Sequence, residues 1–196
     1  MLINNPASDF LASALLPDQS IINNFQLSQY CANAFTLLFF YPLDFTFVCP
    51  TEILALRDKN TEFTKHNVKI VTVSVDSVYT HHKWSELSLK DGGIGAMPFP
   101  MVSDIKKEIS LSYNTLSKDG INLRAVVIID DKFMVRYFSV HDLVIGRNID
   151  ELLRIAVAFQ AADKNNGICP SVWKIGDPVV QPEPIAINNY INSQYK

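Results

Sequence analysis

Cys49 stands where two local features together favour a reactive thiolate. It is followed by Pro50, Thr51 and Glu52. Proline suits the first turn of a helix, where its missing N–H leaves no bond unmade, and an acidic residue there complements the helix dipole. A thiol at a helix entrance faces unpaired backbone N–H groups, which favour the thiolate. These residue types predict a nucleophile at Cys49. The alternative is an inert core cysteine, the common fate of a free cysteine in apolar surroundings.

The elements on either side of Cys49 are expected to hold it in place. The apolar run from Phe35 to Tyr41 is typical of a strand that is buried on both faces. Pro42 ends that strand, because it cannot donate to the sheet. After Cys49, apolar residues recur on one helical face through about residue 66. The sequence therefore predicts a strand, a turn and a helix, with Cys49 at the helix entrance.

Residues 39–52, FFYPLDFTFVCPTE, resemble the active-site signature of the typical two-cysteine peroxiredoxins, the branch that includes bacterial alkyl hydroperoxide reductase subunits. The core Pro42-x-x-x-Thr46-x-x-Cys49 is matched in full, and the similarity runs from about residue 5 to the C-terminal tail. The resemblance implies an α/β, thioredoxin-like fold with peroxiredoxin insertions and a C-terminal arm. The expected parts are a peroxidase domain over residues 1–164 and the arm over residues 165–196.

The same resemblance implies a thiol-dependent peroxidase that acts in antioxidant defence on hydrogen peroxide and alkyl hydroperoxides. The Cys49 thiolate would attack the terminal peroxide oxygen and become a sulfenic acid, releasing water or an alcohol. Cys169 matches the resolving cysteine, which in the family pairs with Cys49 of a partner chain. A thioredoxin-like protein or a flavoprotein reductase would then reduce this disulfide. The expected assembly is a homodimer that forms a ring of five dimers, and no cofactor or metal is expected.

Five further residues match the family pattern around the nucleophile. By resemblance, Arg124 holds the thiolate and the substrate oxygen, although an arginine at a strand edge is often a solvated charge. Thr46 has a hydroxyl that can donate to one peroxide oxygen and accept from the other. Pro42 would exclude water, Glu52 would orient the arginines, and Arg147 resembles a second, supporting arginine.

Further along the chain the pattern alternates between strands and helices. Residues 69–75 read as a second central strand and residues 78–90 as a helix, and this order implies a parallel crossover within an α/β sheet. A helix capped by Ser103 is expected through about residue 113. Residues 124–130 and 135–140 then read as two strands of a hairpin.

The last part of the chain changes character. Asn148 and Glu151 predict a capped helix, which residues 165–167, Asn-Asn-Gly, should end. Four prolines follow Cys169. Such a segment cannot build a core of its own and is expected to lie as an arm over another surface.

Composition excludes several classes of function. A net charge of −3 and the lack of Lys/Arg clusters argue against nucleic-acid binding. Residues 1–20 have no basic region and are interrupted by proline and aspartate, so neither a signal peptide nor a membrane span is expected. These features predict a cytoplasmic protein. Because thiols are kept reduced there, any bond among its three cysteines is expected to cycle.

Two motifs invite other kinds of site. His81 and His82 are adjacent and would point about 100° apart on a helix, so they cannot chelate one metal ion together; solvated or core-edge histidines are expected. The glycine-rich stretch 90–100 lacks the Gly-Lys-Ser/Thr ending of a P-loop, its glycines at 92–95 lack the spacing of a dinucleotide-binding motif, and it reads as a surface loop. In the family, this stretch resembles the segment that covers the arm. Cys31 has no basic neighbour and no helix entrance after it, and is taken as a bystander.

Two rival functions remain to be weighed against the peroxidase. A thioredoxin-type disulfide oxidoreductase needs a C-x-x-C pair, and this chain has none. A holdase-type chaperone or ring scaffold would need large exposed apolar patches in the assembled state. Peroxide consumption compared with suppression of client aggregation separates the peroxidase from the chaperone.

Overall fold

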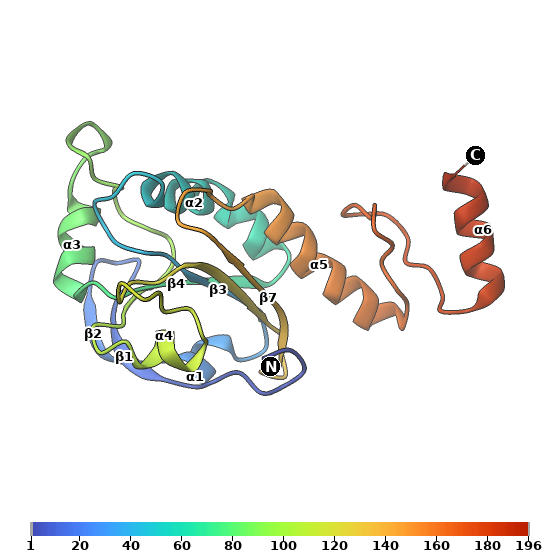
Figure 1. Cartoon of the computed structure of the whole chain (residues 1–196), viewed down its shortest axis with the longest axis horizontal. Helices are drawn as coiled ribbons and strands as arrows, with labels where there is room; N and C mark the ends of the chain where they lie inside the picture. The colour runs from blue at the N-terminus through green and yellow to red at the C-terminus, as the bar shows by residue number, and fades with distance from the viewer. Residues whose placement is uncertain (1, 196) are drawn as a thin grey trace. The chain divides into compact units, whose positions relative to one another are not determined.

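Strand β3 (Phe35–Phe40) lies inside the sheet that organises the first part of the molecule. The computed structural model describes residues 2–195, and within them the sheet has seven strands in the order β2-β1-β5-β4-β3-β6-β7 (Figure 1). All six residues of β3 are buried, as the apolar run predicted. A strand with neighbours on both sides and side chains covered on both faces has no position that tolerates a charge.

The other elements follow the predicted alternation with several additions. The remaining strands are β1 (Leu11–Leu15), β2 (Ile21–Gln26), β4 (Val68–Ser74), β5 (Met101–Ser103), β6 (Arg124–Ile129) and β7 (Val135–His141). The helices are α1 (Leu27–Cys31), α2 (Cys49–Lys65), α3 (Val78–Glu86), α4 (Glu108–Ser112), α5 (Ile149–Asn165) and α6 (Pro184–Gln194), with a 3-10 turn at Leu89–Asp91. Strands β3 and β4 are parallel across α2, and β6 and β7 form an antiparallel hairpin. The predicted α/β class and crossover are thus confirmed.

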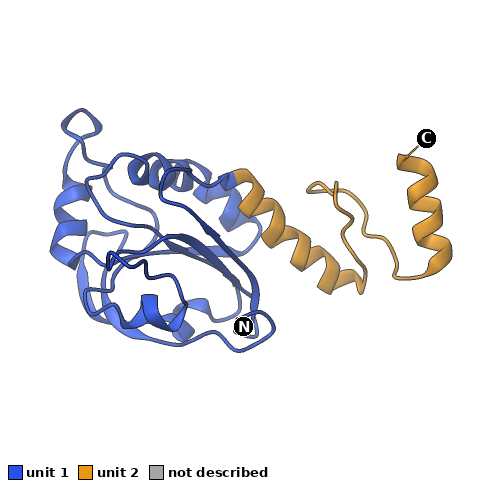
Figure 2. Ribbon diagram, in the orientation of Figure 1, with its two compact units in different colours: residues 1–149 blue, residues 150–196 orange. Residues whose placement is uncertain are grey.

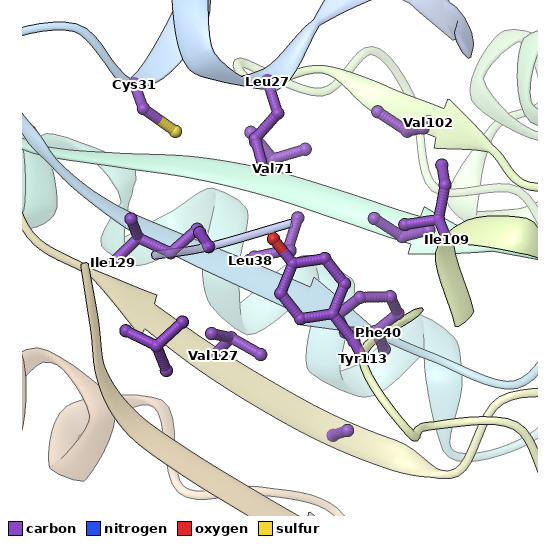
Figure 3. Packing of buried hydrophobic residues seen from close by; sticks show 14 of the residues in the cluster. Leu27, Cys31, Leu38, Phe40, Val71, Val102, Ile109, Tyr113, Val127 and Ile129 are labelled. Atoms are coloured by element: carbon purple, nitrogen blue, oxygen red, sulfur yellow. The ribbon is translucent and has the colours of Figure 1, made fainter. Parts of the chain in front are cut away.

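The two faces of β3 serve different purposes. Successive strand residues point to opposite faces. Leu38 and Phe40 join an apolar cluster with Leu27 and Tyr113, on the side of α1 and α4 (Figure 3). Helix α2 lies on the other side of the sheet (Figure 1). The cluster forms a core on this side, while the other face of the strand, with Leu37 and Phe39 also fully buried, lies toward α2, the helix that begins at Cys49.

Cys31 lies in that apolar cluster, as the last residue of α1 (Figure 3). Burial raises the pKa of its thiol to about 11. The sulfur therefore stays protonated at neutral pH and is shielded from peroxide, which supports its assignment as a bystander. The short helix that carries it was not predicted.

Ser103 does not cap a helix, so this prediction is wrong. It is the last residue of β5, and α4 begins later, at Glu108. The neighbouring Asp104 acts as the acceptor instead: its carboxylate receives hydrogen bonds from the backbone N–H groups of Ile109 at 3.1 Å and Ser110 at 2.7 Å. Strand β5 has only three residues, which is too short to be recognised from its sequence.

His81 is neither solvated nor at the edge of the core, which corrects the prediction. It lies fully buried on α3, with its Nδ1 2.7 Å from the Asp44 carboxylate. The hydroxyl of Tyr41 donates to the other oxygen of that carboxylate at 2.7 Å. His82 is partly exposed and lies 3.7 Å from Glu86. The two histidines diverge as the helix geometry requires.

The glycine-rich stretch is only partly on the surface. Gly93 is buried and closely packed, since a Cβ placed there would lie 2.1 Å from the carbonyl oxygen of Leu87. Ile94 is fully buried. The indole N–H of Trp84 on α3 donates to the carbonyl of Gly92 at 3.1 Å. Only glycine permits this close approach of the loop to the end of α3.

The chain divides into two compact units, residues 1–149 and 150–196 (Figure 2). The second unit holds most of α5, a long loop and α6. Helix α6 was not predicted, because the prolines of this segment indicated an extended arm. The boundary expected between residues 164 and 165 stays a prediction. Within the described residues, no helix is both long and apolar enough to cross a bilayer.

Candidate active site

Cys49 is the first residue of α2, as its sequence neighbours predicted. The turn before it ends at Val48, whose carbonyl accepts from the backbone N–H groups of Thr51 at 3.1 Å and Glu52 at 3.3 Å. Pro50 occupies the next position, where no N–H is needed. The Cys49 side chain is fully buried. A thiol is therefore held at the positive end of a helix and away from bulk water.

Arg124 reaches the sulfur from the neighbouring strand. It is the first residue of β6, and its Nη1 lies 3.4 Å from the Cys49 Sγ. Its Nε donates to the carbonyl of Leu143 at 2.8 Å. Only 4% of the side chain is exposed, so the alternative of a solvated charge is wrong. The Leu143 carbonyl was not foreseen, because a backbone acceptor leaves no mark in the sequence.

Glu52 lies one helical turn after Cys49 and accepts four hydrogen bonds. Its Oε1 accepts from the backbone N–H and the Nε of Arg147, at 2.7 and 2.8 Å. Its Oε2 accepts from Arg147 Nη2 at 2.9 Å and from Arg124 Nη1 at 2.8 Å. Burial by itself raises the pKa of Glu52, but the hydrogen bonds and charge of Arg147 outweigh it, and the pKa lies below its ordinary value. Glu52 is therefore a carboxylate that links two arginines.

Arg147 is fixed by the end of the sheet. The last paired residues of β3 and β6 are Phe39 and Val126. Beyond them, Arg147 Nη1 donates to the carbonyls of Phe40 and Ala125, both at 2.7 Å. The guanidinium carbon also lies 3.3 Å from the centroid of the Phe39 ring. Arg147 thus satisfies two backbone acceptors that the ladder leaves free, and a cation–π contact orients it. The role of Phe39 was missed, because it reads as one more core residue.

The charges around Cys49 do not cancel. Arg124 and Arg147 supply two positive charges and Glu52 supplies one negative charge, and each side chain is at most 4% exposed. An uncompensated buried charge is costly. A thiolate at Cys49 would restore neutrality. The arrangement places an unbalanced positive charge beside the sulfur and offers donors to an oxygen that develops charge there.

Pro42 and Thr46 lie in the turn between β3 and α2. Pro42 is buried and Thr46 is half-buried. The Thr46 hydroxyl donates to the carbonyl of Leu43 at 2.9 Å, which leaves its lone pairs able to accept. The predicted roles of these two residues toward a peroxide stay predictions.

Cys169 belongs to the second unit, whereas the residues just described belong to the first. Its thiol donates to the carbonyl of Ala158 on α5, with a sulfur–oxygen distance of 3.3 Å. Burial raises the pKa of Cys169, while the charge of Arg154 acts in the opposite direction. The thiol therefore rests as a hydrogen-bond donor in this state.

All three cysteines are free thiols. Among residues 2–195, no group of three His, Cys, Asp or Glu side chains is placed to hold a metal ion.

Two protein-family models match the chain. The model of the AhpC/TSA family matches residues 3–138, and the model of the C-terminal domain of 1-Cys peroxiredoxin matches residues 158–193. The first match contains Cys49 and the second contains Cys169. Together they cover most of both units.

The chain is also similar to proteins named as two-cysteine peroxiredoxins. The chain is 42% identical over 192 residues to a chloroplastic 2-cysteine peroxiredoxin of Chattonella marina var. antiqua, covering 97% of each chain. It is 45% identical over 190 residues to a chloroplastic 2-Cys peroxiredoxin of Hordeum vulgare, covering 96% of this chain and 90% of that one. Among solved structures, it resembles reduced 2-Cys peroxiredoxin of Plasmodium vivax with a TM-score of 0.94 and 40% identity, over 98% and 99% of the two chains.

Proposed function

This chain belongs to the two-cysteine peroxiredoxins of the AhpC/TSA family, and from that premise we propose which of its residues carry each half of the reaction. It is a thioredoxin-like, thiol-dependent peroxidase that uses a two-cysteine mechanism in antioxidant defence. Its substrates are peroxides and its electrons come from a thiol reductant. The assignment of individual residues rests on the geometry around Cys49 and on the loop that carries Cys169.

In the first half, the Cys49 thiolate attacks the terminal peroxide oxygen. The O–O bond breaks, sulfur gains the oxygen as a sulfenic acid, and the other oxygen leaves with a proton as water or an alcohol. Arg124 stabilises the sulfur and the departing charge, and Glu52 and Arg147 hold that arginine in place. Thr46 accepts from the peroxide proton, and it donates to the other oxygen only by giving up its 2.9 Å hydrogen bond to the Leu43 carbonyl. Pro42 excludes water.

The observation that carries this assignment is the net charge of the buried cluster. Two guanidinium groups and one carboxylate leave one positive charge unbalanced, and Arg124 Nη1 lies 3.4 Å from the Cys49 sulfur. A peroxide needs an anionic nucleophile and donors for the oxygen that leaves. The cluster supplies both without a metal or an organic cofactor.

In the second half, Cys169 of a partner chain attacks the sulfenic sulfur of Cys49 and forms an intersubunit disulfide. The family supports this pairing. A thioredoxin-like protein or a flavoprotein reductase restores the thiols. Hydrogen peroxide and alkyl hydroperoxides are the proposed substrates, and a ring of five homodimers is the proposed assembly. A reducing compartment such as the cytoplasm suits a disulfide that must be reopened in each cycle.

Intact mass measurement tests both halves together. Protein treated with one equivalent of peroxide should gain no oxygen, lose two hydrogens per Cys49–Cys169 pair, and migrate as a covalent dimer on a non-reducing gel. Supplying thioredoxin with its reductase should restore the monomer band and sustain peroxide consumption. An oxidised protein that migrates only as a monomer would overturn the intersubunit pairing.

A further inference from the structure

The loop that carries Cys169 has its own hydrogen-bonded frame. Residues 168–180, here called the Cys169 loop, are closed at their ends because Ile168 and Val180 exchange backbone hydrogen bonds of 2.8 and 2.9 Å. Trp173 is buried within the second unit, and its indole N–H donates to the carbonyl of Asp177 at 3.0 Å. A loop with paired ends and a buried aromatic side chain keeps its internal shape, so it is expected to move on and off its support as one body.

Two side-chain hydrogen bonds tether this loop to α5. One is the bond from the Cys169 thiol to the Ala158 carbonyl, at 3.3 Å. The other runs from Arg154 Nη1 on α5 to the Trp173 carbonyl, at 3.0 Å. A bidentate ion pair with Glu151 orients the Arg154 side chain, through Nε at 2.6 Å and Nη2 at 2.7 Å. One guanidinium therefore fixes both its helical neighbour and the loop.

The two tethers respond differently to the reaction. A carbonyl oxygen accepts a hydrogen bond from a thiol but repels a thiolate. The thiolate is the form of Cys169 that attacks. Loss of the proton therefore removes the first tether and leaves the second intact. After Cys169 ionises, the Arg154–Trp173 hydrogen bond still holds the loop against α5.

We propose that Arg154 is a positioning residue that latches the Cys169 loop to α5 and thereby limits how fast Cys169 becomes available to oxidised Cys49. The effect on turnover rests on the proposed function, because it needs Cys169 to be the resolving thiol. The latch itself does not, because it concerns only the exposure of Cys169. Arg154 takes part in no bond that is made or broken.

The step that the latch controls is balanced without another reactant. The Cys169 thiolate attacks the sulfur of the Cys49 sulfenic acid, an S–S bond forms, and the S–O bond breaks. The oxygen leaves as hydroxide and takes up a proton to become water. The Cys169 sulfur is oxidised, and the Cys49 sulfur is reduced to the disulfide level.

Replacing Arg154 with lysine tests the latch while keeping the charge. An ammonium group is a single point donor and cannot bind both carboxylate oxygens of Glu151 and the Trp173 carbonyl together. Arg136→Lys is the matched control: this arginine is 22% exposed, against 28% for Arg154, and pairs with Asp130 in the first unit. Glu151→Gln is a second variant, which weakens the bidentate pair that orients Arg154 but leaves Arg154 itself unchanged.

The first readout is alkylation of Cys169 by iodoacetamide, followed by mass in a Cys49→Ser background. Arg154→Lys should raise the alkylation rate about tenfold, which is the lower end of the effect of losing one hydrogen bond to a charged group. Glu151→Gln should raise it less, and Arg136→Lys should leave it unchanged. If Arg154→Lys and Glu151→Gln both label at the starting rate, the latch is overturned.

The second readout is stopped-flow kinetics with both Cys49 and Cys169 present. The phase that depends on peroxide concentration should be unchanged in Arg154→Lys, and the phase that is independent of peroxide should quicken by the factor seen in alkylation. Faster alkylation with an unchanged second phase would overturn the claim that the latch limits disulfide formation. Absence of a Cys49–Cys169 disulfide in the unsubstituted protein would overturn the proposed pairing instead, while alkylation would still decide the latch.

Discussion

Glu52 and Arg147 form a buried bidentate pair, with Nε–Oε1 and Nη2–Oε2 distances of 2.8 and 2.9 Å. Arg147 also binds the carbonyls of Phe40 and Ala125, where the pairing of β3 and β6 ends. The pair therefore joins the nucleophile's helix to the ends of the two central strands β3 and β6. Glu52 lies one helical turn after Cys49, and Arg147 binds both Glu52 and the sheet backbone. The position of Cys49 therefore depends on how α2 packs against the sheet.

Glu52→Gln should lower the free energy of unfolding by about 3–5 kcal/mol, because it leaves two guanidinium groups buried without their carboxylate. It should also slow the reaction of Cys49 with peroxide, since Arg124 loses an acceptor that orients it. Urea unfolding and stopped-flow kinetics measure the two effects. Glu62→Gln is the control, because Glu62 lies on the same helix in an exposed pair with Lys65 at 2.7 Å; no change in either quantity is expected there.

Cys49→Ser should abolish peroxide reduction and leave the fold intact, because a hydroxyl of nearly the same size cannot become a sulfenic acid. Cys31→Ser should change the activity little, since Cys31 is buried with a raised pKa. Peroxide consumption and circular dichroism are the measurements. Turnover in Cys49→Ser near that of the unsubstituted protein would remove the basis of the whole assignment.

Mixing two inactive variants should restore one disulfide. Cys169→Ser alone should stay monomeric on a non-reducing gel and accumulate oxidised Cys49, and Cys49→Ser alone should form no Cys49–Cys169 bond. Exchanged subunits of the two variants can pair Cys49 of one chain with Cys169 of the other. A covalent dimer that appears only in the peroxide-treated mixture supports pairing between chains, whereas none should appear if the bond forms within a chain.

The buried pair of His81 and Asp44 should make stability depend on pH. Burial alone lowers the pKa of His81, but the charge and hydrogen bond of Asp44 raise it above its ordinary value. The stabilisation is therefore complete below the unfolded pKa, about 6.5, and is lost as the pH rises through the folded pKa. His81→Asn should remove the loss of unfolding free energy that begins as the pH rises above about 6.5. A slope in His81→Asn equal to that of the unsubstituted protein contradicts the assignment, and His82→Asn should keep the original slope.

Ile191→Phe should lower the peroxide concentration at which sulfinic Cys49 appears by mass. Ile191 lies on α6, next to Tyr190, and is 45% exposed. The family resemblance implies that the glycine-rich stretch 92–95 covers the C-terminal arm. A phenylalanine at position 191 would bury more area there and add aromatic contacts, which would strengthen docking of the arm by about 1 kcal/mol. A tail that is released more slowly lengthens the life of the sulfenic acid. Ile185→Phe is the control on the same helix, at a position that is 75% exposed; an unchanged or higher threshold in Ile191→Phe rejects the docking argument.

Local sequence determined the elements that hold the nucleophile. The apolar run of β3 and the Cys-Pro-Thr-Glu start of α2 predicted a strand, a turn and a helix with Cys49 at its entrance, because backbone conformation there follows from neighbouring residue types. The match to a family signature supplied the expected partners, Arg124 and Arg147. Neither residue carries a local signal that separates a site arginine from a solvated one.

The tertiary structure alone decided which charges are buried together. Arg124 and Arg147 stand 72 and 95 positions from Glu52 in the chain. They meet because β6 pairs with β3, and because Arg147 binds the carbonyls of Phe40 and Ala125 just beyond the last paired residues of these strands. The full burial of His81 depends in the same way on how α3 packs against the sheet. Burial and charge pairing depend on surfaces that folding brings together, so residue spacing could not predict them. Helix entrances and buried strands depend on adjacent residues, so the sequence could predict these.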